Sequence, residues 1–247
     1  MLGVGAVALL FSIVFVSQIL AFIGLGLVFW GALLLYIRNP EYTQKALLEA
    51  SVLPSLATLN QMLQELNYEG DAVYLPPKYF EDPEATKIYI PKQKNTPLPT
   101  PEQIQKYENR LLAKKSQGVL GMLLTPPGAE LTNLFEKALE TSFTKVDIEY
   151  LQRKMPKLFI EDLEIAENLE IEKLEHNKIH VKVTNPIFKD LCEKASKLTY
   201  VCGSIGCPIC SSIACAIAKA SGKLVTIEKI ESTEDGKTLT ADYKIIE

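Results

Sequence analysis

The sequence begins with the residues MLGVGAVALLFSIVFVSQILAFIGLGLVFWGALLLYI, numbers 1–37, which include no Asp, Glu, Lys, Arg or His. The chain's 30 acidic and 26 basic residues therefore all lie beyond this stretch. About 20 apolar residues in a helix cross a bilayer core of about 30 Å. The stretch predicts a transmembrane segment of one or two helices, with the lipid bilayer as partner. Because Ser17 and Gln18 interrupt it near the middle, a hairpin of two short helices is favoured over one tilted helix.

The residues around the end of this segment predict its orientation. Trp30 and Tyr36 fit an aromatic belt at the membrane interface, and Arg38 and Lys45 follow it. Positive charge beside the exit favours a cytoplasmic domain. Five cysteines, an odd number, also argue against a disulfide framework for an oxidising compartment. We therefore expect a protein of the cell membrane whose soluble domain is cytoplasmic.

The remaining sequence divides into a short helical region and a larger domain. Residues 38–70 predict a juxtamembrane helical region, with a helix over 41–66 that Pro54 kinks or splits. Residues 71–247 predict a soluble domain, in which the proline-rich stretch 91–101 is a linker or surface loop.

Hydrophobic periodicity within the domain changes between helical and strand spacing. Helices are predicted over residues 102–115, 131–139, 147–155, 186–197 and 208–221. Strands are predicted over residues 72–75, 87–90, 119–124, 161–172, 178–183, 198–202, 224–230 and 238–246. Hairpin turns at 175–177 and 234–236 join consecutive strands. The fold class is therefore α+β, with mainly antiparallel strands.

Composition excludes several classes of function. A net charge of −4 argues against a nucleic-acid-binding surface, which requires a positive field. Hydrophobic residues at 47% and charged residues at 23% exclude a mostly disordered chain. No Ser-His-Asp arrangement, zincin motif or dinucleotide fingerprint is present, so no catalytic residue is assigned and an enzyme is not favoured.

One stretch carries suggestive chemistry: CGSIGCPICSSIAC, residues 202–215. Pro208 fits the first position of a helix, which places Cys207 at the N-cap and Cys210 in the first turn. Free backbone N–H groups and the helix dipole lower the pKa of a thiol at that position. Cys207 and Cys210 lie on one face of the helix, whereas Cys215 lies about 140° from Cys210.

Several interpretations of these thiols stay open. The residues can be reduced core cysteines that let a small-residue helix pack closely on a sheet. Alternatively, Cys207 and Cys210 form a redox pair, or Cys202, Cys207 and Cys210 bind zinc or an iron–sulfur cluster. A fourth metal ligand would be Cys192 or Cys215, and Cys192 is better placed. Anion binding by residues 203–206 at the helix start is a further alternative.

Three short elements support a resemblance: Tyr-Leu-Pro-Pro at 74–77, Pro-Pro-Gly-Ala at 126–129 and Gly-Cys-Pro-x-Cys-Ser at 206–211. With the uncharged N-terminal segment, they resemble an uncharacterised family of archaeal membrane proteins. The last 60 residues are also similar to the end of V4R-type ligand-binding domains, although no ligand residue carries over. The resemblance implies membrane location and leaves the activity open.

Together these features predict a membrane-anchored, non-enzymatic protein without a cofactor. Its cytoplasmic domain is expected to bind a small ligand or a protein partner, with self-association through the membrane segment as a further possibility. The alternative is a thiol-redox or metal-binding protein that uses the Cys202, Cys207 and Cys210 cluster.

Overall fold

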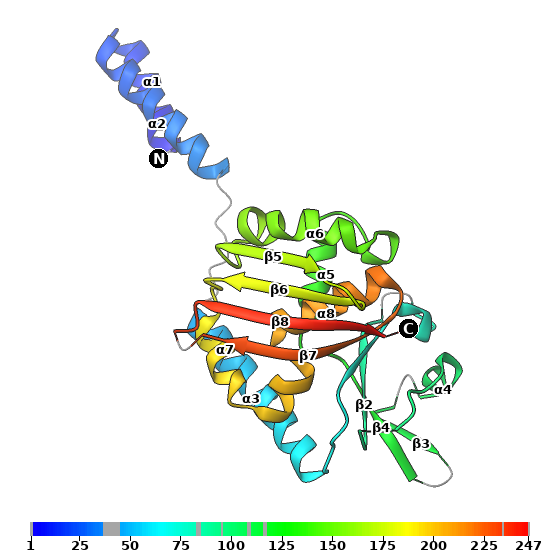
Figure 1. The fold of residues 1–247 in the computed structure, drawn as a ribbon. Coiled ribbons are helices and arrows are strands. Elements are labelled where there is room, and N and C mark those ends of the chain that lie inside the picture. The colour runs from blue at the N-terminus through cyan, green and yellow to red at the C-terminus, as the bar shows by residue number, and fades with distance from the viewer. Residues whose placement is uncertain are drawn as a thin grey trace. The chain divides into compact units, whose positions relative to one another are not determined.

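The computed structural model describes residues 2–36, 45–82, 85–94, 96–107, 110–115, 118–233 and 235–246. The chain divides into two compact units, Met1–Gln44 and Lys45–Glu247 (Figure 1). Residues 45–70 of the expected juxtamembrane region fall within the second unit, while its start at 38–44 lies outside the described residues.

The first unit contains two helices, α1 (Leu2–Val14) and α2 (Gln18–Tyr36). The chain reverses through Val16, whose φ is +47°, and the Ser17 amide donates to the Ser12 carbonyl at 3.1 Å. The helices pack along each other at two glycines. A Cβ on Gly24 would lie 2.9 Å from Leu9, and one on Gly5 would lie 2.7 Å from Val28. These glycines therefore allow close helix packing.

One helical run among the described residues, Val201–Ser221, is long and apolar enough to cross a membrane. It lies inside the second unit, where 83% of its apolar window is buried, so it is a core helix of that unit. The apolar runs near the N-terminus, Gly3–Val14 and Gln18–Leu33, are shorter.

The second unit is built on an eight-stranded sheet with the order β3-β4-β2-β1-β7-β8-β6-β5 (Figure 1). Every neighbouring pair is antiparallel, as expected for the α+β class. The strands are β1 (Val73–Leu75), β2 (Lys87–Pro91), β3 (Leu112–Lys115), β4 (Gly118–Leu124), β5 (Asn168–Lys173), β6 (Lys178–Thr184), β7 (Leu224–Ser232) and β8 (Thr238–Ile246).

Each face of the sheet borders its own hydrophobic core. Alternation along β6 and β8 buries Ile179, Val181 and Tyr243 in the larger core, which also holds helix α8 (Pro208–Ser221). The opposite face of β1, β2 and β4 borders a smaller core with Val73, Tyr89 and Leu123. Strands β1 and β2 are thus buried on both faces.

The remaining helical segments surround α8 or lie beside the sheet. Helices α5 and α6 pack on α8, which itself contacts β1, β7 and β8, and α3 contacts α7. These segments are α3 (Lys45–Glu65), α4 (Pro101–Gln105), α5 (Ala129–Ala138), α6 (Ile148–Lys157), α7 (Lys189–Ser196) and the short turns η1 (Pro77–Tyr79), η2 (Phe143–Lys145), η3 (Leu158–Asp162) and η4 (Val201–Ile205).

Four predictions from the sequence need correction. Residues 112–115, predicted as the end of a helix, form β3, because they pair with β4. Of residues 198–202, predicted as a strand, 199–202 are helical, with the Cys202 amide donating to the Leu198 carbonyl at 2.8 Å. The strand predicted from Glu161 begins only at Asn168, after the π-helical turn η3. Pro54 does not split α3, which continues across it.

Candidate functional site

Helix α8 begins and ends where the sequence predicts. Cys207 is its N-cap, with φ −68° and ψ 168°, and Pro208 occupies the first helical position. Gly222 ends the helix in the left-handed conformation, with φ +62°. The preceding Gly206 has φ +81°, and a Cβ there would lie 3.0 Å from Cβ of Cys210. The glycine therefore permits the turn that brings Cys207 to the helix start.

The three sequence elements quoted above meet at one buried hydroxyl, that of Ser211. The Gly128 amide donates to Ser211 Oγ at 3.1 Å, and Tyr74 Oη lies 2.9 Å from the same atom. Tyr74 Oη also donates to the Ile205 carbonyl. These bonds join β1, the start of α5 and the start of α8 in one network. One residue of each element, namely Tyr74, Gly128 and Ser211, thus contributes to the packing around α8.

Close approach of α5 to α8 requires glycine at 128. A Cβ at that position would lie only 2.1 Å from the backbone nitrogen of Ser212. Farther along the two helices, Lys219 Nζ lies 2.7 Å from Glu136 Oε2, and both side chains are buried. Glu136 Oε1 also accepts the Phe143 amide at 2.7 Å. The contact between α5 and α8 therefore includes a buried ion pair.

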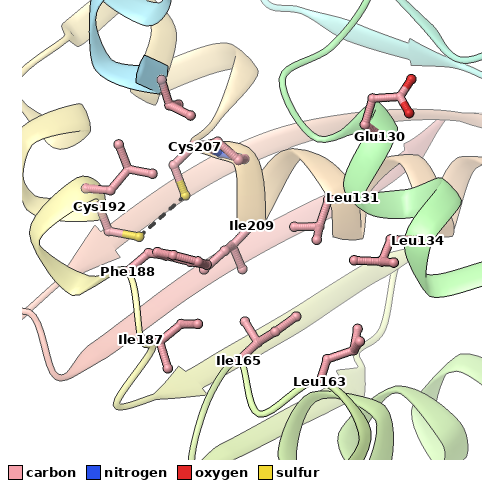
Figure 2. A pocket seen from close by; sticks show the side chains of 13 residues that line it. Glu130, Leu131, Leu134, Leu163, Ile165, Ile187, Phe188, Cys192, Cys207 and Ile209 are labelled. Atoms are coloured by element: carbon pink, nitrogen blue, oxygen red, sulfur yellow. Dashed lines mark hydrogen bonds between the residues drawn. The ribbon is translucent and has the colours of Figure 1, made fainter. Parts of the chain in front are cut away.

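The start of α8 brings thiols together from two helices. Sγ of Cys207 lies 3.8 Å from Sγ of Cys192 on α7 (Figure 2). None of the five cysteines forms a disulfide. The pKa of Cys207 is held well below its usual value by hydrogen bonds from the Cys192 and Cys210 thiols, and the backbone amides of Ile209 and Cys210 add to this effect. Cys207 is therefore deprotonated more readily than an ordinary thiol.

The neighbouring thiols have raised pKa values. Cys210 donates to Cys207, which together with burial raises the Cys210 pKa well above its usual value. Burial raises the pKa of the half-buried Cys202 to about 11 and that of Cys215 to about 12. Cys215 adjoins Thr132 of α5. Of the cysteines in the stretch 202–215, Cys207 alone has a lowered pKa, and the neighbouring thiols lower it more than the amides at the helix start do.

The predicted metal ligands were Cys202, Cys207, Cys210 and Cys192. The structure places Cys207 beside both Cys192 and Cys210. Cys202 is close enough to Cys207 and Cys210 for electrostatic interactions between the thiols to change their pKa values. Among the described residues, no group of three or more His, Cys, Asp or Glu side chains is arranged to hold a metal ion. Zinc or iron–sulfur binding stays a prediction, to be tested by metal analysis.

An apolar cavity of about 510 Å³ opens beside the thiol pair (Figure 2). Glu130 is the one charged residue among those that form its wall, and its carboxylate points away from the apolar side chains in Figure 2. The wall consists of Val52, Glu130, Leu131, Leu134, Leu163, Ile165, Ile187, Phe188, Leu191, Cys192, Cys207, Pro208 and Ile209.

Most of this wall was not predicted from the sequence. Leu163 and Ile165 were interpreted as the inward face of a strand, but they lie between η3 and β5 and face the cavity. Ile187 and Phe188 follow a turn at Asn185, whose φ is +47°. The sequence signal for these two residues is an apolar pair directly after a turn. Ile187 is 44% exposed and lies at the edge of the cavity.

The geometry defines a class: an α+β protein whose apolar cavity is walled in part by a pair of reduced thiols. The chain belongs to the family described as Domain of unknown function (DUF7982), whose model matches residues 1–243. No curated protein and no solved structure gave a significant match.

Proposed function

We propose that this chain is a membrane-anchored binding protein whose α+β unit takes an apolar small molecule into the cavity beside α5, α7 and α8. The cavity is the observation that carries the proposal. Its volume of about 510 Å³ lies within the range of about 300–1,000 Å³ typical of small-molecule sites. Its wall offers aliphatic and aromatic contacts with few polar groups, so the ligand is expected to be apolar.

The edge of the cavity supports entry of a ligand from outside. Leu134 and Ile187 belong to its wall and are 45% and 44% exposed. Deeper in the wall, Ile165 and Ile209 are buried. An apolar molecule that enters would cover the exposed side chains and gain the free energy of removing apolar surface from water, about 25 cal/mol per Å².

The first unit supports the membrane part of the proposal. Exposed apolar side chains surround both helices, including Leu10, Ile13, Ile19 and Phe22. Residues 1–37 carry no charge, so lipid would cover these surfaces at little electrostatic cost. Arg38 and Lys45 after the hairpin favour a cytoplasmic location for the second unit, at the cell membrane.

Photolabelling of the full-length chain in lipid nanodiscs tests the cavity. A small aliphatic diazirine is the probe, and labelled peptides are identified by mass spectrometry. We expect labels on cavity residues such as Leu131 and Ile187, besides labels on the two apolar helices. The helices serve as an internal reference, because lipid-exposed residues collect the probe in every variant.

Two substitutions make the test specific. Leu131→Trp fills the cavity and should remove its labels, whereas Leu174→Trp, at an exposed site in the turn between β5 and β6, should leave them unchanged. Thermal unfolding confirms that both variants are folded. Cavity labels of equal strength in both variants, or none in the natural sequence, would overturn the proposal.

Metal analysis separates this proposal from the alternative. Reduced, purified protein is expected to hold no stoichiometric zinc or iron. About one equivalent of zinc that is lost in Cys207→Ser would favour the metal-binding alternative built on Cys192, Cys202, Cys207 and Cys210 instead.

A further inference from the structure

We propose that Cys192 and Cys207 form a thiol–disulfide exchange site, whose substrate is a small uncharged disulfide bound in the apolar cavity. The site goes beyond ligand binding, because the two cysteines transfer two electrons to the substrate disulfide and reduce it. It also differs from the pair indicated by the sequence, Cys207 and Cys210.

Geometry selects the pair. The Sγ atoms of Cys192 and Cys207 are 3.8 Å apart, and both residues belong to the cavity wall. Cys202, Cys210 and Cys215 do not belong to that wall. A molecule in the cavity therefore meets Cys192 and Cys207, which point toward each other in Figure 2.

Cys207 is the attacking thiol. It sits at the N-terminus of α8, where the Ile209 and Cys210 amides stabilise the thiolate, and the Cys192 and Cys210 thiols donate to it. Cys192 is then the resolving thiol, since its sulfur already lies beside that of Cys207. Cys210 also donates to the Cys207 thiolate and does not belong to the cavity wall.

The exchange balances in two steps. The Cys207 thiolate attacks one sulfur of the disulfide, so that a Cys207–substrate S–S bond forms and the first substrate thiolate leaves. Cys192 then transfers its proton to that thiolate and attacks Cys207 Sγ, which expels the second substrate thiolate. That thiolate takes a proton from solvent, replacing the one that Cys207 released. The two cysteines are oxidised to a disulfide and the substrate is reduced to two thiols.

The wall selects an uncharged substrate. Apart from Glu130 at the edge, the residues around the thiol pair carry no charge that could balance an ionic substrate. Transfer of an unpaired charge into such surroundings is unfavourable. Bond formation requires the two sulfur atoms to approach by about 1.8 Å from their 3.8 Å separation.

Peptide mapping of the full-length protein in detergent tests the pairing. Reduced protein is treated with 2-hydroxyethyl disulfide, remaining thiols are blocked, and trypsin digestion follows without reduction. A Cys192–Cys207 bond joins the peptides 190–194 and 198–219, because Lys189, Lys194, Lys197 and Lys219 provide the cleavage sites. A Cys207–Cys210 bond instead leaves 198–219 as a single peptide lighter by two hydrogens.

We expect the joined peptides, with fragmentation placing the bond at Cys207. In Cys192→Ser the reaction should stop at a mixed disulfide on Cys207, and in the matched variant Cys210→Ser the joined peptides should still form. The anionic glutathione disulfide should react about tenfold more slowly than the uncharged reagent. The single lighter peptide, an unreacted Cys207, or faster reaction of glutathione disulfide would each overturn the proposal.

Discussion

At the residue scale, Cys207 shows how an N-cap position changes the chemistry of a thiol. Its side chain accepts hydrogen bonds from two other thiols, and the amides of the first helical turn point at it. These interactions outweigh burial, which alone would raise its pKa. A buried thiol elsewhere on the same helix, Cys215, has its pKa raised to about 12.

The pKa values of Cys207 and Cys202, which lie on one tryptic peptide, predict that their alkylation rates depend differently on pH. The thiolate reacts, so the alkylation rate follows the fraction of deprotonated thiol. Cys207, with a pKa well below the usual 9.0, should approach a constant rate as the pH rises from 6 to 9. Cys202, with a pKa of about 11, should become about tenfold faster for each pH unit over that range.

Alkylation by iodoacetamide, quantified by mass spectrometry of peptide 198–219, measures both rates in one sample. Cys202 serves as the internal control for the reagent and for unfolding. Parallel rises of the two rates with pH would contradict the lowered pKa of Cys207.

At the element scale, the approach of α5 to α8 depends on Gly128. The Cβ of an alanine there would meet the Ser212 backbone at 2.1 Å, so the helices must separate and the Gly128–Ser211 hydrogen bond must lengthen. We expect Gly128→Ala to lower the free energy of unfolding by about 2–4 kcal/mol. Urea denaturation of the full-length protein measures the change.

Gly203→Ala is the matched control. Gly203 lies in η4, where an added Cβ has no atom within 4 Å. Its replacement should alter the free energy of unfolding by less than about 1 kcal/mol. A Gly128→Ala variant as stable as Gly203→Ala would show that α5 can shift without loss of packing.

The ion pair between Lys219 and Glu136 gives a second prediction at this scale. Lys219→Met leaves the Glu136 carboxylate buried without its cation, although Ser142 and the Phe143 amide still donate to it. The expected loss is about 3–5 kcal/mol. The double variant Lys219→Met/Glu136→Gln should be more stable than the single one, because no buried charge remains.

Urea denaturation of the two variants gives the comparison. Glu136→Gln alone serves as the reference for the removed carboxylate. A double variant less stable than Lys219→Met would contradict the assigned cost of the unpaired charge.

Elements with strong local signals were predictable from the sequence. Pro208 and Gly222 bracket α8, and the alternation in residues 178–183 and 238–246 matches β6 and β8. The prediction of a helix at residues 112–115 was wrong, because the sequence Leu-Ala-Lys-Lys has helical propensity but its structure is decided by pairing with β4. The prediction of a strand at residues 198–202 was wrong for the opposite reason, because residue types that are common in strands form a helical turn here.

The candidate site was predictable only in part. Cys207 and its helix-start position follow from local sequence. Its lowered pKa follows only in part, because the largest contribution is the hydrogen bond from Cys192 on α7. The cavity could not be predicted, because its wall combines residues from Val52 to Ile209 that meet only through tertiary packing. The pairing of Cys192 with Cys207 depends equally on how α7 packs.

At the scale of the whole molecule, the apolar hairpin predicts firm membrane attachment. We expect the full-length chain to stay in the membrane pellet after a carbonate wash, because most exposed side chains of α1 and α2 are apolar and residues 1–37 include no charged side chain. A chain starting at Glu41 should be soluble after cell lysis. Immunoblotting of pellet and supernatant measures both.

A reagent that cannot cross the membrane checks the orientation in the same cells. A charged maleimide applied to intact cells should not label Cys202, whereas it should do so after lysis. Release of the full-length chain by carbonate would contradict membrane anchoring, and labelling in intact cells would reverse the cytoplasmic assignment.

The position of β1 in the middle of the sheet has a consequence for biosynthesis. Tyr74 pairs with Ile88 on one side, but on the other side it pairs with Val225, about 150 residues later. At about 5–20 residues per second, a ribosome needs about 8–30 s to supply that second partner. During this interval the helices α1 and α2 have already been synthesised, while β1 still lacks β7, its partner on one side. Folding of the sheet is therefore completed only after β7 and β8 have been synthesised.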